Sequence, residues 1–135
     1  MKAGRNNQKK LVFYLIWVLF IFTGIASADD GKAESGDTTI ILMKLLKAVE
    51  DYDYDNFVAD GSAVFKAGIT KQMFEGVCAQ LSPRMKKGYD KTYLGRLNQQ
   101  GCHVYLWKLQ FNDAKDDILA KLVLKDGGLA GFWLQ

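Results

Sequence analysis

The stretch HVYLWKLQF, from His103 to Phe111, decides the fold class of this 135-residue chain. Its side chains alternate with period two, so that Tyr105 and Trp107 share one face with His103 while Lys108 lies on the other. Alternation of this kind over four or more residues is typical of a β-strand.

Three further strand-like runs surround this stretch, at residues 91–98, 118–125 and 130–135. The segments between the runs are short and contain Gly, Asn or Asp, as hairpin turns do, at 99–101, 112–115 and 126–128. Because short turns join consecutive strands in antiparallel fashion, we expect a four-stranded meander. In the third run, Lys121 and Lys125 mark the wetter of the two faces.

Helical spacing precedes the strands. Apolar residues from Ile41 to Val49 recur at helical intervals, which predicts a helix that ends near Asp51 and is capped by Asp37 or Thr38. Asp53 or Asp55 is expected to cap a short second piece, whereas residues 63–68 show no preference. Thr70 is expected to cap a third helix, which Ser82-Pro83 should interrupt. Helices followed by a meander predict an α+β fold with the helices on one face of the sheet.

The order of these elements resembles that of the nuclear transport factor 2-like superfamily, also called SnoaL-like or cystatin-like. The resemblance covers about residues 38–135 and is carried by four stretches, Asp53-Tyr54-Asp55-Asn56-Phe57, Tyr93-Leu94-Gly95, Val104 to Leu109 and Gly131 to Gln135. It implies a curved sheet folded around helices into a cone with a pocket at its open end. Members of this superfamily use the pocket for isomerase chemistry, for small molecules or only for packing, and some pair their sheets into homodimers.

If a small-molecule pocket lies between the sheet and the helices, aromatic strand residues are expected to form its walls, since such side chains bind apolar or flat ligands. The candidates are Tyr93, Tyr105, Trp107 and Trp133, with Lys121 as a charge at the mouth. The alternative is that these aromatic side chains are ordinary core residues. The main functional hypothesis is therefore a non-catalytic binding or interaction module, whose partner is a small molecule, an envelope protein or a second copy of the chain.

The alternative function is a small enzyme of isomerase or dehydratase type, with a pocket Asp or His103 as general base. No local motif places a set of catalytic residues, and the Asp groups at 51–55 and 113–117 fit helix caps and solvated turns. Asp51-Tyr-Asp-Tyr-Asp lacks the Gly and Glu of a calcium loop. One His and two Cys leave a zinc site without a fourth ligand, so we expect no metal and no cofactor.

The first 28 residues have the pattern of a secretory signal peptide. A basic start precedes an apolar run from Leu11 to Phe22, and Ala26-Ser27-Ala28 supplies small residues for cleavage after Ala28. Residues 29–36 are expected to be a flexible leader and residues 37–135 a single domain, secreted or periplasmic. The alternative is an N-terminal membrane anchor, because Leu11 to Ala28 is close to the length that spans a bilayer.

Cleavage changes the charge of the chain. The full sequence has 18 basic and 15 acidic residues, a net charge of +3, and removing residues 1–28 takes away four basic residues and no acidic ones. The remaining 14 basic and 15 acidic residues give a net charge of −1. Because nucleic-acid binding needs clustered positive charge, we expect no nucleic-acid partner.

The two cysteines, Cys78 and Cys102, both lie in the part of the chain expected to be exported. An oxidising compartment would allow a disulfide between them. The alternative is two separate thiols that pack as small apolar side chains.

Overall fold

The computed structural model describes residues 35–135, so the expectations for the signal peptide and for most of the leader lie outside the described residues. Within these residues the chain is α+β, as expected: four helices precede four strands. The strands form one antiparallel sheet in the order β1-β2-β3-β4. The helices are α1 (Gly36–Asp51), α2 (Tyr54–Val58), α3 (Ala63–Gly68) and α4 (Lys71–Met85), and the strands are β1 (Tyr89–Gln99), β2 (Cys102–Phe111), β3 (Ile118–Lys125) and β4 (Gly128–Leu134).

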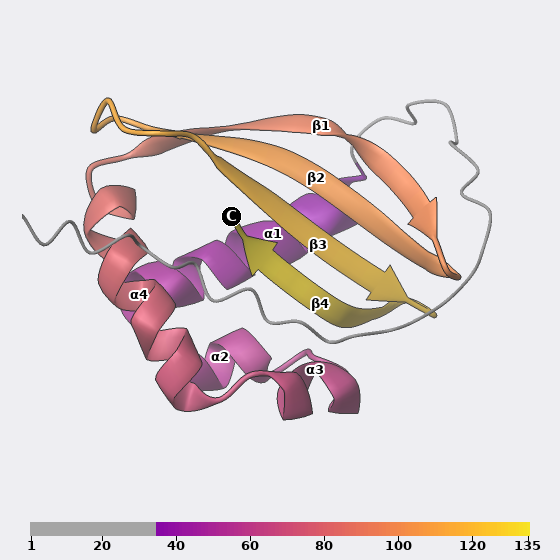
Figure 1. The fold of residues 1–135 in the computed structure, drawn as a ribbon. Helices are drawn as coiled ribbons and strands as arrows, with labels where there is room; N and C mark the ends of the chain where they lie inside the picture. The colour runs from indigo at the N-terminus through magenta and orange to yellow at the C-terminus, as the bar shows by residue number, and fades with distance from the viewer. Residues whose placement is uncertain (1–34) are drawn as a thin grey trace, which may run out of the picture.

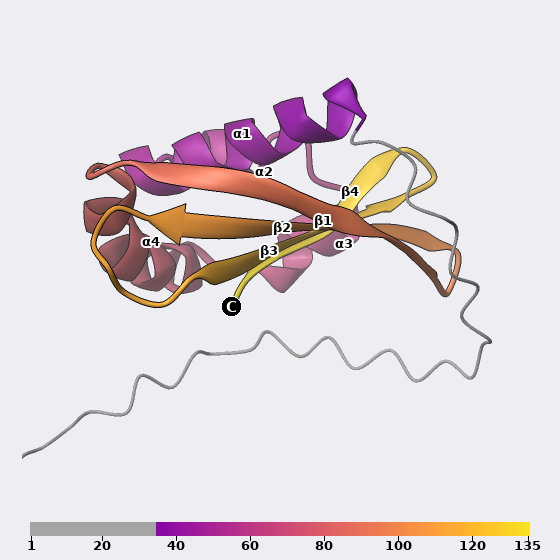
Figure 2. The same ribbon diagram turned by 90° about the horizontal axis from the view of Figure 1, so that it is seen from above.

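The helices and the sheet form two layers. Figure 1 looks onto the sheet with α1 running behind it, and Figure 2 shows the same α1 on one side of the strands. The helix α4 lies beside the end of the sheet where β1 begins and where β2 turns into β3. We call the sheet face that packs on the helices the inner face and the opposite one the outer face. No helix of residues 35–135 crosses the outer face.

The core lies between the inner face and the helices. Alternate residues of the strands point into it, among them Trp107, Leu109, Ala120 and Leu122, each with 0% exposure. Helix α1 contributes Leu42 and Leu46, also fully buried. The remaining space is filled by aromatic rings, with Phe57 in contact with Phe65, Phe74 and Phe132 at centroid distances of 4.8 to 6.0 Å.

Helix starts agree in part with the sequence. Asp53 and Thr70 cap α2 and α4 as predicted, each accepting from the amide three residues ahead. The cap of α1 is Ser35, not Asp37 or Thr38, so the leader was extended too far. The sequence prediction also missed α3, which Ser62 caps.

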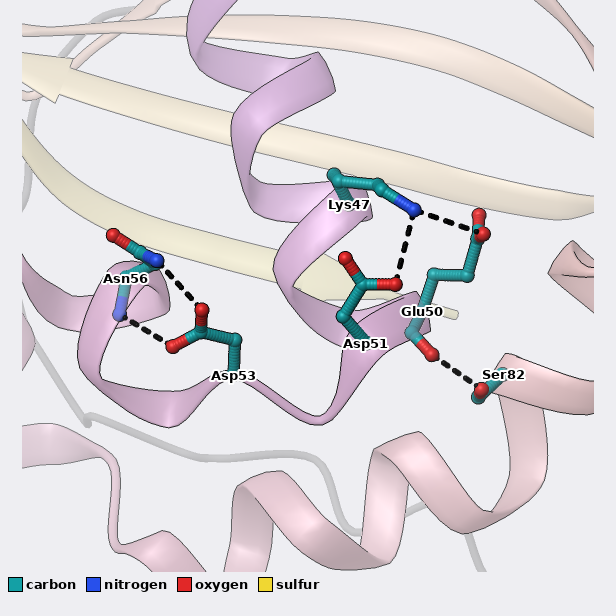
Figure 3. A network of polar contacts seen from close by, with 6 residues as sticks. All are labelled: Lys47, Glu50, Asp51, Asp53, Asn56 and Ser82. Carbon is teal, nitrogen blue, oxygen red and sulfur yellow. Dashed lines mark hydrogen bonds and ion pairs between the residues drawn. The ribbon is translucent and has the colours of Figure 1, made fainter.

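Helix α4 continues through Pro83, contrary to the prediction that Ser82-Pro83 would interrupt it. Pro83 lies in the last turn, where the loss of one backbone donor disrupts few further hydrogen bonds. The turn is also held from outside, because the buried Ser82 hydroxyl donates to the Glu50 carbonyl oxygen at 2.6 Å, as Figure 3 shows.

Candidate interaction surface

The five residues predicted to line one pocket lie on opposite faces of the sheet. Tyr93, Tyr105 and Trp107 belong to the inner face, with Trp107 fully buried and the two tyrosines packed against the core. The Trp107 ring stacks on that of Tyr105, with centroids 6.2 Å apart, and contacts that of Tyr93 in a tilted arrangement, with centroids 5.5 Å apart. Lys121 and Trp133 are cross-strand partners on the outer face. The five side chains therefore do not line a common pocket.

The outer face has an apolar surface of its own. Two rows of cross-strand neighbours carry it: Leu97, Val104 and Val123 pair across β1, β2 and β3, and Leu106 lies beside Lys121 and Trp133. Val104 has only 4% exposure yet lies outside the main core cluster, so it is covered by its neighbours on this face. We call Leu97, Val104, Leu106, Leu119, Val123 and Trp133 the outer apolar patch.

Trp133 lies flat on this patch. A Cβ atom at Gly131 would come within 2.2 Å of the Trp133 ring, so the indole covers the backbone of β4 at that glycine. The Lys121 ammonium lies 4.9 Å from the ring centroid, close enough for a cation–π interaction. Both contacts fix the indole against the sheet and keep the patch flat.

The charged side chains of this face already have partners within the chain. Lys108 lies 3.9 Å from Asp117, and Lys121 stacks on Trp133 as described above. Lysine side chains can also turn outward and keep their ammonium groups in water while their methylene chains cover apolar surface. The patch therefore includes one charged side chain, Lys121, which lies between Leu106 and Trp133 in the register of the sheet.

The sequence offered a signal for this surface that the prediction did not use. In β2 both sets of alternating positions are apolar: Trp107 and Leu109 face the core, while Val104 and Leu106 face outward. In β3, Leu119 and Val123 repeat the pattern opposite Ala120 and Leu122. Strands that are apolar on both faces are typical of sheets covered on both sides. The prediction gave weight to the aromatic positions and took the face with Leu119 and Val123 as the wetter one, because it also carries Lys121 and Lys125.

The acidic corner between α1 and α2 acts as a set of helix caps and ion pairs. Asp53 accepts from the Asn56 backbone amide at 3.0 Å and from its side-chain amide at 2.6 Å, and these hydrogen bonds lower the pKa of Asp53. Lys47 lies between Glu50 and Asp51, at 3.2 and 3.0 Å (Figure 3), and its hydrogen bonds, led by the one to Asp51, raise the pKa of Lys47. A depression of about 290 Å³ opens here. Residues 35–135 contain no group of three metal-ligating side chains.

The second acidic group, at residues 113–117, joins helix α4 to the turn between β2 and β3. Arg84 on α4 donates to both carboxylate oxygens of Asp113, at 2.6 and 3.2 Å, and to the Asp116 carbonyl oxygen at 2.8 Å. The Arg84 guanidinium also lies 4.2 Å from the centroid of Phe111. Because of these hydrogen bonds from Arg84, the pKa of Asp113 is lowered. The sequence gave no indication of this pair, whose members are 29 positions apart.

The candidate bases of the enzymatic alternative lie outside the core. The His103 side chain is exposed, and its Nδ1 lies 2.7 Å from Asn98 Oδ1 across the β1–β2 hairpin. Asp113, with a side chain 4% exposed, has both oxygens engaged by Arg84. Among residues 35–135 the buried polar residues are Thr38 and Ser82, neither of which is a carboxylate or an imidazole.

The cysteines follow the second of the two possibilities that the sequence left open, two separate thiols. Cys78 and Cys102 are both free thiols, Cys78 fully buried on α4 and Cys102 partly exposed at the start of β2. The β1–β2 hairpin lies at the end of the sheet away from α4, so the fold separates the two cysteines (Figure 1). Burial raises the pKa of the Cys78 thiol to about 11.

The similarity of this chain to known proteins is distant. No family model matches the chain, and no curated protein matches it. One solved structure with similarity is an uncharacterised cystatin-fold protein from Novosphingobium aromaticivorans, with 10% sequence identity and a TM-score of 0.39 over 71% of this chain and 95% of that one. Among residues 35–135, no helix is long and apolar enough to cross a membrane.

Proposed function

We propose that this chain is an exported, non-catalytic interaction module of the nuclear transport factor 2-like class, and that its partner is a second copy of itself. The observation that carries the proposal is the outer apolar patch, which no helix of the described residues covers. Side chains of the core cluster pack between the sheet and the helices. This packing favours association through the outer face over a small molecule held inside.

The size of the outer face supports a dimer. Four strands about 4.8 Å apart, with lengths of 7 to 11 residues at about 3.3 Å per residue, give a face of about 19 by 30 Å. Two such faces in contact would bury about 1,100 Å², which reaches the area of roughly 1,000 Å² that a specific interface needs.

The alternative function, an isomerase or dehydratase, receives no support from a specific side chain. Its general base should be a buried carboxylate or imidazole beside the aromatic residues. The Asp113 side chain is buried, but Arg84 engages both of its oxygens, and His103 is exposed. The export of the protein stays part of the proposal. Sequencing the N-terminus of the protein recovered from the periplasm or the medium should give Asp29 as the first residue, and recovery of the intact chain in the membrane fraction would contradict it.

The dimer is tested by the mass of the exported protein in solution. Sedimentation velocity at tens of micromolar should give twice the monomer mass. Trp133→Glu should yield a folded monomer, because a charge would then lie within the apolar patch. Val64→Glu is the matched control, since Val64 is 57% exposed on α3 and lies outside the outer face. A monomeric wild-type protein would refute the proposed dimer. If such a monomer instead bound an envelope protein through the outer face, the interaction surface would be correct but the proposed partner would be wrong.

A further inference from the structure

One leucine on the outer face protrudes because of an irregularity in β1. The pairing of β1 with β2 runs from Tyr93 opposite Trp107 directly to Gly95 opposite Leu106, so Leu94 has no partner in the register. Gly95 has a φ of 145°, a conformation open to glycine. A bulge of this kind redirects a side chain, and the Leu94 side chain is 55% exposed.

Leu94 stands beside a depression on the same face. The depression has a volume of about 290 Å³ and is lined by Leu94, Lys108, Asp117, Ile118, Leu119 and Gln135. Leu119 belongs to the outer apolar patch, and Lys108 and Asp117 form an ion pair beside it at 3.9 Å. The chain thus presents an exposed apolar side chain and a partly apolar depression next to each other.

We infer that Leu94 of one copy inserts into this depression of the second copy and sets the register of the dimer. The inference rests on the proposed function, since it concerns the same outer face. In a two-fold interface the contact of residue i with residue j is repeated from j to i, so one protruding side chain and one depression supply two identical contacts. Leu94 forms a wall of the depression, so the two-fold axis passes close to it. Burial of both leucines removes apolar surface from water.

Equilibrium sedimentation of the exported protein tests how much Leu94 contributes to the affinity of the dimer. Leu94→Ala should weaken the dimer at least about tenfold in Kd, because the contact is lost twice. Leu94→Met, of similar volume, should retain most of the affinity. Val64→Ala, an exposed apolar truncation away from the face, should leave the Kd unchanged. Because Leu94 is exposed, its variants should keep the far-UV circular dichroism spectrum of the wild type, which the same samples can confirm.

Cross-linking between copies tests the geometry. In a Cys102→Ser background, chains with Leu94→Cys are mixed with chains with Leu119→Cys and oxidised. Each chain then carries one accessible thiol, and a covalent dimer of the two kinds of chain is expected. Chains with Val64→Cys mixed with the Leu119→Cys chains should give none. A wild-type dimer that forms no Leu94→Cys to Leu119→Cys link and is unaffected by Leu94→Ala would overturn this inference alone, whereas a monomeric wild type would overturn the proposed function as well.

Discussion

At the scale of single residues, Gly131 shows how one absent side chain shapes the outer face. Its missing Cβ leaves room for the Trp133 indole, which would otherwise be 2.2 Å away. The adjacent strand then supplies Lys121 above the ring. A residue with any side chain at position 131 would force the indole off the sheet and separate it from this ammonium group.

Gly131→Ala should therefore destabilise the protein by about 0.5–1 kcal/mol, because the displaced indole loses its cation–π contact with Lys121. The displaced indole should also change the tryptophan emission spectrum. Urea unfolding followed by fluorescence measures both effects. Gly76→Ala is the control: no atom lies near its added Cβ, and it sits inside α4, where alanine should raise stability by about 1 kcal/mol. Equal stability of Gly131→Ala and wild type would contradict the placement of Trp133.

Asp113 predicts how stability depends on pH. Its pKa is lowered in the folded protein, chiefly by the Arg84 hydrogen bonds, from the ordinary value of 3.8. The folded state thus binds this proton less readily than the unfolded state, so the Asp113–Arg84 pair stabilises the fold above pH 3.8 and the contribution is lost as the pH falls through the folded pKa.

Urea unfolding at pH 7 and at pH 3 should show this loss in the wild type and a smaller loss in Asp113→Asn, which cannot ionise. Asp90→Asn removes an exposed carboxylate on β1 and should keep the wild-type dependence. If Asp113→Asn and wild type lose the same stability between the two pH values, the Arg84 contact does not shift the pKa of Asp113 in solution.

At the scale of elements, local signals located the strands and most helices. The residues at 118–125 form β3 as predicted, since both the alternation and the turns are encoded locally. Helix α3 was missed because its six residues carry no apolar period, and its stability depends on tertiary contacts such as the packing of Phe65 on Phe57. The prediction that Ser82-Pro83 interrupts the helix was wrong for a related reason. The Ser82 hydroxyl that holds this turn donates to Glu50, which lies 32 positions earlier in α1 and cannot be recognised as a partner from local sequence.

The N-cap of α4 offers a test at this scale. Thr70 Oγ1 accepts from the Met73 amide at 3.2 Å, so Thr70→Ala leaves that donor without its side-chain partner. The free energy of unfolding should fall by about 1 kcal/mol, and the thermal midpoint should fall by roughly 4–8 °C for a domain of this size. Gln80→Ala, at an exposed position of the same helix, should not lower the midpoint. An unchanged midpoint in Thr70→Ala would mean that α4 does not depend on its cap.

At the scale of the whole molecule, the sequence does not predict which residues of different strands share a face of the sheet. The alternation put Lys121 on the wetter face of its strand, but it did not show that Trp133 shares this face, because the register of β3 and β4 fixes that choice. The sequence also does not show how far apart two residues lie in the folded protein. Cys78 and Cys102 are 24 positions apart in the chain, and only the fold reveals that one is in α4 and the other at the opposite end of the sheet.

The two cysteines should therefore remain thiols in the native protein, even under oxidising conditions. Titration of dilute native protein with a thiol reagent should show one fast reaction, from the partly exposed Cys102, and a second only after unfolding, because Cys78 is buried and its raised pKa of about 11 leaves little thiolate. Cys102→Ser should abolish the fast reaction and leave the slow one. A protein with no reactive thiol in denaturant but two after reduction would contain the disulfide, and α4 would then have to lie against the β1–β2 hairpin, contrary to the arrangement in Figure 1.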